Sequence, residues 1–407
     1  MNAFSRMVGT TTLGIMLCAS GLALAEDKIH LKMGLMTDMG GLTSAVSGSG
    51  SVLAAQMAIE DYKAVDPGIE VEFVSADHQL KADVGATIAR RWLDQEQVDV
   101  IVDVPGSAIV LAIVDLVRER NKVILATHSS SSRITGTSCS PNTVAFTYSA
   151  WALANGTGSA VVRQGGDSWF FITADWEYGH SVQAETTGVI EAAGGQVLGS
   201  VLFPLETTDF SSYLLQAQAS GAKVIGLIQS GPQTINTVKQ ANEFGIVRAG
   251  QSLATMYFTH MDAHALGLAS AQGLQFTVAW DSNLDEPARE FSSRFAERNR
   301  GQVPSQEQAG VYSAVYQYLR AVSEAGSAED GKRVLETMRG WDWFEDRLFG
   351  KTRLREDGTV DHNMYLAKVK SPDESQDAWD YFEILETIPA ETAFQPLGQT
   401  GCPLVGQ

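Results

Sequence analysis

The sequence predicts an α/β protein made of two doubly wound, Rossmann-like lobes, and three observations support this. Short runs of valine, isoleucine and leucine alternate with longer amphipathic runs of helical period. That alternation is typical of parallel sheets covered by helices on both faces. The pattern occurs twice in series, and a chain of 407 residues is longer than a single hydrophobic core usually supports.

The first repeat lies in the amino-terminal third of the chain. Continuous apolar runs predict strands at 29–36, 71–75, 98–104 and 123–126. Runs with apolar residues three and four positions apart predict helices at 52–62, 84–93 and 107–119. Four strands with three intervening helices form one complete βαβ layer, so this segment is expected to build the sheet of one lobe.

The second repeat follows the same order. Strands are expected at 169–172, 197–203, 224–228 and 253–258, and helices at 180–193, 210–219 and 232–244. Gly194 and Gly195 suit a left-handed end to the first of these helices. Thr208 or Asp209 is a plausible N-cap for the second helix. This repeat is therefore expected to form the second lobe.

The pattern changes after Trp280. Helices are expected at 287–300, 306–325 and 332–338, and a strand-compatible segment at 363–370. Because these elements exceed what the second sheet needs, we expect about three crossings between the lobes, which together make a multi-stranded hinge. The expected division is a leader at 1–25, lobe one at 26–147 plus 281–360, and lobe two with the tail at 148–280 plus 361–407.

The amino terminus has the layout of a cleaved secretory signal peptide. Arg6 precedes an apolar segment at 7–24, and a small-x-small site ends at Ala25. A membrane anchor is the alternative, but the apolar run is short and interrupted by polar residues. Lipoprotein processing at Cys18 is disfavoured by the two bulky residues before it. We therefore expect an exported, periplasmic protein.

The net charge indicates which partners to exclude, and the cysteine content indicates which disulfide to expect. The formal charge of −19 becomes −20 once the leader removes one arginine and no acid, which disfavours nucleic acid or an anionic membrane as a partner. Export leaves Cys139 and Cys402. An even pair in an exported chain usually forms a disulfide, and two free buried thiols are the alternative.

Several segments of the chain resemble the leucine/isoleucine/valine-binding family of type I periplasmic binding proteins, which serve ABC importers. They are AAQMAIEDY (54–62), TADWEYGHS (173–181), TTDFSSYLLQAQASGAKVIGL (207–227) and QAGVYSAVYQYLRAV (308–322). The resemblance implies two lobes, three hinge strands and a small molecule held between them. It also implies permease subunits as partners and a monomer. CSPNTV (139–144) and GCPLV (401–405) resemble a subgroup in which these two cysteines are paired.

Candidate ligand contacts follow the strands of lobe one. In open α/β sheets, ligands bind beyond the carboxyl ends of the strands, where helix N-termini present free N–H groups. The candidates there are Thr43, Ser47, Ser107, His128, Ser129 and Ser130. Hydroxyls and amides at helix starts suit a carboxylate, and the resemblance assigns that role to the loops at 107 and 128–130. A helix cap or a turn is the structural alternative for any single serine.

Lobe two and the crossings supply the remaining candidates. They are Tyr148, Trp176, Tyr178, Gln229, His260, Asp262 and Trp280. Aromatic rings beside a cleft give a flat apolar wall with polar tips, and ordinary packing between the lobes is the alternative.

The ligand class stays open between two kinds of acid. The family default is an amino acid of the branched-chain type. However, His128 interrupts the expected run of small residues, and only Asp262 or Glu177 offers a carboxylate for an α-ammonium group. His128 and the tryptophans and tyrosines suit a flat ring, so an aromatic or other amine-free acid is the alternative.

Motifs for catalysis or cofactors are absent from the sequence. The segment Gly350-Lys351-Thr352 lacks the earlier glycine of a phosphate loop, and no dinucleotide, Gly-x-Ser-x-Gly or His-Glu-x-x-His pattern occurs. His260 and His264 alone are a weak metal pair. We expect a binding protein with no cofactor and no metal. The rivals are a ligand sensor for a receptor and a hydrolase that uses the serines at 129–132.

Overall fold

A computed structural model describes Met1 and residues 28–406, so the predicted signal peptide lies outside the described residues. The first sheet has the strand order β2-β1-β3-β4-β5, and every neighbouring pair is parallel. Its strands are β1 (Ile29–Thr37), β2 (Ile69–Asp77), β3 (Val100–Asp103), β4 (Val123–Ala126) and β5 (Thr143–Ala145). β3 and β4 are buried at every position, as continuous apolar runs require.

The second sheet has seven strands in the order β15-β14-β10-β9-β8-β6-β7. The pairs among β6 to β10 are parallel, and β14 and β15 add antiparallel at one edge. Their bounds are β6 (Ser168–Ala174), β7 (Gln196–Phe203), β8 (Val224–Ile228), β9 (Ser252–Thr255), β10 (Gln275–Val278), β14 (Met364–Val369) and β15 (Phe382–Ile388). A small antiparallel sheet contains β11 (Phe344–Asp346), β12 (Gly350–Leu354) and β13 (Val360–Asp361).

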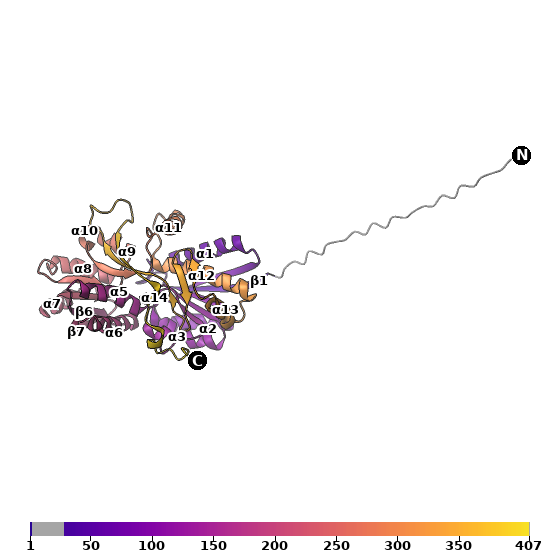
Figure 1. Cartoon of the computed structure of the whole chain (residues 1–407), viewed down its shortest axis with the longest axis horizontal. Helices are drawn as coiled ribbons and strands as arrows, with labels where there is room; N and C mark the ends of the chain where they lie inside the picture. Colours follow the sequence, from indigo (N-terminus) through magenta and orange to yellow (C-terminus); the bar gives the residue numbers. More distant parts are fainter. Residues whose placement is uncertain (2–27, 407) are drawn as a thin grey trace.

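Helices cover the two large sheets, and Figure 1 shows them gathered into two lobes side by side. The helices are α1 (Gly48–Val65), α2 (Ala82–Asp94), α3 (Ser107–Glu119), α4 (Ser132–Thr135), α5 (Ala150–Arg163), α6 (Glu177–Ala192), α7 (Ser211–Ala219), α8 (Pro232–Glu243), α9 (His260–Leu266), α10 (Leu268–Ala271), α11 (Glu286–Arg298), α12 (Gln306–Ala325), α13 (Gly331–Gly340) and α14 (Ala390–Ala393). The predicted α/β class with two lobes is confirmed.

The late helices return to the first lobe, as the sequence predicts. Arg294 of α11 pairs with Asp61 of α1 at 2.6 Å, and the hydroxyl of Tyr312 of α12 donates to the same carboxylate at 2.7 Å. The chain then re-enters the second sheet at β14. It thus passes between the sheets after β5, after β10 and before β14. The exact lobe boundaries remain a prediction.

Some local predictions differ from the structure. The strand expected at 253–258 ends at Thr255, because the apolar residues that follow lie in a buried loop and not in the sheet. Helix α7 begins after Phe210, and the Asp209 carboxylate accepts from the Ser211 amide at 2.9 Å in a local turn. Gly194 has a φ of 87°, the left-handed value expected at the end of α6.

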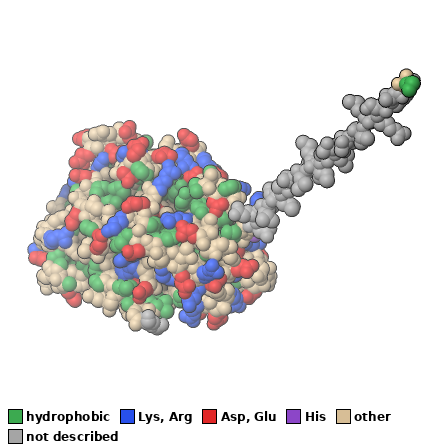
Figure 2. All heavy atoms as spheres, turned by 45° about the vertical axis from the view of Figure 1, so that its right-hand side comes forward, with side chains coloured by type: hydrophobic (Ala, Val, Ile, Leu, Met, Phe, Trp, Pro, Cys, Tyr) green, Lys and Arg blue, Asp and Glu red, His purple; other side chains and the backbone are tan. Residues whose placement is uncertain are grey.

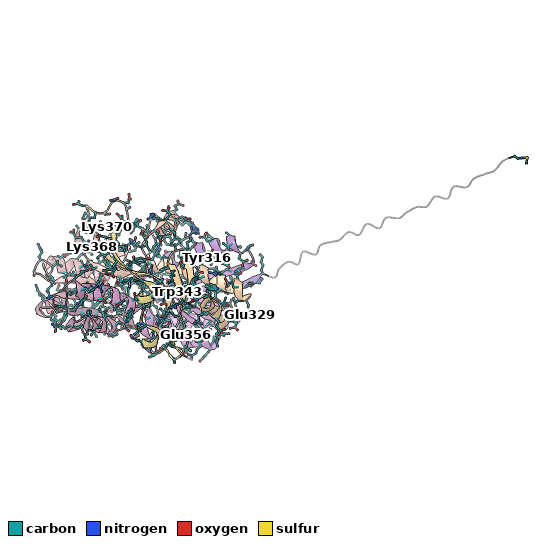
Figure 3. The ribbon with its side chains drawn as sticks, viewed as in Figure 1. Tyr316, Glu329, Trp343, Glu356, Lys368 and Lys370 are labelled. Atoms are coloured by element: carbon teal, nitrogen blue, oxygen red, sulfur yellow. A yellow bond between two sulfur atoms is a disulfide. The ribbon has the colours of Figure 1, made fainter. Side chains whose placement is uncertain are left out.

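The surface carries interspersed charges of both signs (Figure 2). Lys368 on β14 and Lys370 directly after it, both labelled in Figure 3, pair with Glu383 and Asp380 at 2.7 and 2.6 Å. No helix within residues 28–406 combines the length and the apolar character that a bilayer crossing requires.

A disulfide joins Cys139 to Cys402 with a Cα–Cα distance of 5.7 Å. It closes a loop of 263 residues and fastens the end of the chain beneath the first lobe, where Figure 1 places the carboxyl terminus near α3. The predicted pairing is confirmed. Since the bond restricts the unfolded chain, its stabilisation in the chain-entropy model is at most roughly 5 kcal/mol.

Replacing both cysteines, Cys139→Ser with Cys402→Ser, is expected to lower the melting temperature by several degrees, because the unfolded chain gains freedom. Thermal unfolding followed by circular dichroism measures the shift. A reductant should lower the melting temperature of the wild type and leave that of the double variant unchanged. Equal melting temperatures for the two proteins without reductant would contradict the structural role.

Candidate ligand-binding site

A cavity lies where loops from the two large sheets meet. Its walls come from segments that follow the carboxyl ends of strands in both lobes, the usual binding position in open α/β sheets. The lining residues are Thr43, Gly106, Ser107, His128, Ser129, Ser130, Tyr148, Trp176, Tyr178, Ser230 and Tyr257. The set contains no Asp, Glu, Lys or Arg, so any ligand charge must be met by neutral dipoles.

The first lobe supplies a wall of hydroxyls and helix N–H groups. Gly106, with a φ of 98°, turns the chain directly after β3, and α3 begins at Ser107. The amides of the first helical turn have no partners inside the helix and favour negative charge. The Ser107 hydroxyl oxygen accepts from the amides of Ser130 and Ser131 at 3.2 and 3.1 Å. These two bonds fix the loop after β4 against the start of α3.

His128 forms the centre of this wall. Its Nδ1 lies 2.8 Å from the Ser47 hydroxyl, and its Nε2 lies 3.5 Å from the Tyr257 hydroxyl. Burial lowers the pKa of the imidazole to about 3, because the charged form is poorly solvated there. His128 is therefore neutral at physiological pH.

Aromatic rings form the opposite wall. Trp176 and Tyr178, at the start of α6, pack edge to face with centroids 5.6 Å apart. Tyr257 lies 6.4 Å from Tyr178, 6.0 Å from Tyr148 and 6.1 Å from His128, with which its ring is stacked. Such a wall suits a flat or apolar ligand body.

Four polar side-chain groups that line the cavity are buried and have no hydrogen-bond partner within the described chain. They are Ser130 Oγ, Trp176 Nε1, Tyr178 Oη and Ser230 Oγ. A buried polar group without a partner costs about 1–3 kcal/mol. All four can donate a hydrogen bond, so a ligand with strong acceptor atoms would satisfy them together.

A buried carboxylate lies behind the aromatic wall. Glu307, in the first turn of α12, is fully buried and accepts from the Tyr257 hydroxyl at 2.9 Å. Burial raises the pKa of this carboxyl to about 7, against the opposing effect of hydrogen bonds from its own backbone, Ser305, Tyr257 and Tyr148. Glu307 does not line the cavity.

Direct contacts join the lobes at the rim of the cavity. The Ser131 hydroxyl donates to Glu177 at 2.8 Å, and Arg133 pairs with the same carboxylate at 3.3 Å. The Ser132 amide donates to the Ser181 hydroxyl at 3.0 Å. Both partners lie on α6 of the second lobe, so these bonds hold the lobes together over the cavity.

The structure brings most of the sequence candidates to the cavity. Thr43, Ser107, His128, Ser129, Ser130, Tyr148, Trp176 and Tyr178 line it, and Ser47 stands directly behind His128.

Four candidates lie elsewhere among the described residues. Asp262 caps its own helix α9 by accepting from the hydroxyl and the amide of Thr259. His260 pairs with Asp281 at 3.0 Å. Gln229 donates to the carbonyl of Gln233 within lobe two, and Trp280 packs against Phe291 in the core. Each is held by residues outside the cavity.

Besides Gly106, three residues at or behind the cavity wall were not among the candidates. Ser230, and not its neighbour Gln229, reaches the cavity. Tyr257 was hidden because the sequence placed it inside a strand that ends two residues earlier. No local signal in the sequence marks Glu307, which meets Tyr257 only through tertiary packing.

Metal ligation has no support within residues 28–406, where no three His, Cys, Asp or Glu side chains are grouped to hold an ion. The ring of His264 stacks on Trp379 instead, with centroids 4.6 Å apart.

The chain is similar to known proteins over most of its length. The family model described as periplasmic binding protein matches residues 30–376. A periplasmic binding protein from Burkholderia mallei is 41% identical, with a TM-score of 0.89, and the match covers 93% of this chain and 99% of that one. A branched chain amino acid ABC transporter periplasmic ligand-binding protein from Burkholderia xenovorans is 38% identical, covers 92% and 99%, and has a TM-score of 0.83.

A more distant solute binding protein of an ABC transporter, from Rhodopseudomonas palustris, was solved in complex with 3,4-dihydroxybenzoic acid. It is 20% identical, with a TM-score of 0.80, and the match covers 89% of this chain and 98% of that one. At that identity the likeness shows the shared fold.

Replacing Ser107 by alanine is expected to destabilise the protein by roughly 2 kcal/mol, because the amides of Ser130 and Ser131 lose their acceptor in a buried position. Thermal or urea unfolding measures the change. Ser44→Ala, at a partly exposed loop serine, is the control and should change stability by less than about 0.5 kcal/mol. Equal stabilities for the two variants would count against the role of Ser107.

The stability difference between the wild type and Glu307→Gln should depend on pH. Because the folded pKa of Glu307 is about 7 and the unfolded value is about 4.3, its contribution is present in full below the lower value. It is lost as the pH rises through the higher one. Glu307→Gln lacks this titration, so the wild type should lose stability relative to it between pH 4.5 and 7.5, by about 1 kcal/mol or more. A constant difference across that range would show that the carboxyl titrates normally.

Proposed function

Because this chain belongs to the periplasmic binding protein family, we propose that it is the extracytoplasmic solute-binding component of an ABC importer and captures a small organic acid without an amine. Its partners are then the permease subunits at the membrane. The relatives of 41% and 38% identity carry names of this class, and the predicted signal peptide agrees with an extracytoplasmic, periplasmic location.

One observation carries the ligand proposal: four buried groups without partners line a cavity that has no charged side chain. An acidic group would accept from these donors and from the free amides at the start of α3. A full negative charge is tolerable among neutral donors because hydrogen bonds to an ionised acceptor are stronger than those between neutral groups. The ring-lined remainder of the cavity suits an apolar, flat body.

A branched-chain amino acid is the second candidate. The 38% identical relative is named for that class, and family frequency favours it. Its α-ammonium group would need a carboxylate, yet Asp262 is engaged in a helix cap and Glu177 in the rim contacts with Ser131 and Arg133. The amine-free acid therefore fits the geometry better.

Capture would work by closure of the lobes. Ser130 belongs to the first lobe, and Trp176 and Ser230 belong to the second, so a ligand contacts both sets of donors only when the lobes are together. Binding then shifts the population towards the closed form, which the rim contacts of Glu177 also favour. The permease would recognise this closed form.

Binding without turnover is part of the proposal. Among the serines of the wall, Ser129 donates its hydroxyl to the carbonyl of Val104, and Ser107 accepts from two amides. Ser47, which lies beside the imidazole of His128, is fully buried, does not line the cavity, and donates its proton to the carbonyl of Thr43. No exposed nucleophile–base pair is formed by these residues.

Isothermal titration calorimetry of the mature protein with benzoate, isocaproate and leucine tests the ligand class. The amine-free acids are expected to bind more tightly than leucine. Ser130→Ala and Ser230→Ala should each weaken acid binding about tenfold, because each removes one donor to the carboxylate. Ser44→Ala serves as the control and should bind normally. Tight binding of leucine with no binding of either amine-free acid would establish the second candidate instead.

A further inference from the structure

Two lining residues, His128 and Tyr257, differ chemically from the four unpaired donors and indicate a further group on the ligand. Their rings are stacked on each other with an interplanar angle of 18°. The question is which of their atoms carry protons, because that decides what they recognise.

The tautomer of His128 follows from its contact with Ser47. The Ser47 hydroxyl lies 3.1 Å from the carbonyl oxygen of Thr43 and 2.8 Å from His128 Nδ1. A carbonyl oxygen only accepts, so the single hydroxyl proton must go to Thr43 if both contacts are hydrogen bonds. The Ser47 oxygen then accepts from Nδ1–H. Since burial lowers the pKa of His128 to about 3, the ring holds one proton only, and Nε2 is left as an acceptor.

The hydroxyl proton of Tyr257 is likewise engaged by a neighbouring side chain, here Glu307. Its oxygen lies 2.9 Å from Glu307 Oε1 and 3.5 Å from His128 Nε2. When Glu307 is ionised, above its pKa of about 7, its carboxylate is both the nearer and the stronger acceptor, so the proton points to Glu307. The Tyr257 oxygen therefore faces the remaining space with lone pairs only.

The Tyr148 hydroxyl, the other donor nearby, also gives its proton to ionised Glu307. Tyr257 Oη and His128 Nε2, 3.5 Å apart, are then both acceptors. Buried acceptors without a donor cost free energy, and one O–H or N–H group placed beside them would satisfy one or both. A full ammonium charge is disfavoured there, because the cavity lining holds no carboxylate and Tyr257 stands between the cavity and Glu307. A neutral hydroxyl fits these two atoms best.

We propose that the ligand is a hydroxylated acid, whose hydroxyl donates to His128 Nε2 or Tyr257 Oη while its carboxylate accepts from the unpaired donors of the cavity. Glu307 is a positioning residue: it does not touch the ligand but holds the Tyr257 proton away from it. Thr43 and Ser47 likewise keep the imidazole proton of His128 on Nδ1, so that Nε2 is left as an acceptor. This inference rests on the proposed function and specifies its ligand further.

Matched probes test the inference by calorimetry at a pH of about 8, where Glu307 is ionised. They are benzoate with 3- and 4-hydroxybenzoate and 4-methoxybenzoate, and isocaproate with 2-hydroxyisocaproate and leucine. In at least one series the hydroxylated acid should bind about tenfold tighter or more than the acid without the hydroxyl. In the aromatic series, the methyl ether, which cannot donate, should lose that advantage.

Variants separate recognition from stability. Tyr257→Phe should reduce the preference for the hydroxylated acid to within about twofold while the parent acid still binds, because the cavity loses this acceptor and keeps its unpaired donors. Tyr178→Phe, which removes one of the unpaired donors proposed to bind the carboxylate, is the matched control and should weaken the binding of both acids equally. Glu307→Met should also reduce the preference, since the freed Tyr257 proton can point to His128. Glu307→Gln, whose amide oxygen can still accept that proton, should restore much of it.

The outcomes distinguish this inference from the proposed function. Equal binding of hydroxylated and parent acids, or a preference that survives Tyr257→Phe, would overturn the hydroxyl assignment and leave the importer role intact. Leucine binding more tightly than 2-hydroxyisocaproate would replace the hydroxyl by an ammonium group. Failure of every acid to bind would overturn both proposals.

Discussion

The hydrogen bonds that Ser107 accepts from the Ser130 and Ser131 amides organise the site. They join the start of α3 to the loop after β4, so two strand ends of the first lobe form one continuous wall. The same loop continues to Ser131 and Arg133, which contact Glu177 of the other lobe. Positioning of the donors and contact between the lobes therefore depend on a single fixed loop.

Exclusion of charge from the cavity shapes its chemistry. A lysine or arginine would bind an anion strongly, but a transport protein must also release its cargo. Neutral hydroxyls, an indole N–H and helix amides can hold a carboxylate by hydrogen bonds that are made when the lobes close and lost when they open. The charges that the site does use, Arg133 and Glu177, lie at the rim, where they stabilise closure without contacting the ligand.

In the proposed arrangement, the protons of His128 and Tyr257 point away from the cavity, so both side chains face it as hydrogen-bond acceptors. Ser47 fixes the proton of His128, and Glu307 fixes that of Tyr257. Both partners lie outside the cavity lining, so selectivity would be set by residues that the ligand never touches. This arrangement combines two lobes, since His128 follows β4 whereas Tyr257 follows β9.

The sequence alone determined the fold class and the two βα repeats, because the periodicity of apolar residues is a local property of the chain. It also determined the disulfide pair, because only two cysteines follow the predicted leader. It also placed eight of its candidates on the cavity, since strand ends converge in any parallel sheet. Tertiary structure decided the rest. Asp262 was taken by its own helix cap, Ser230 replaced Gln229, and Glu307 reached Tyr257 from a helix 50 residues later in the chain. Proton positions depend on such distant contacts, and no local pattern of residues encodes them.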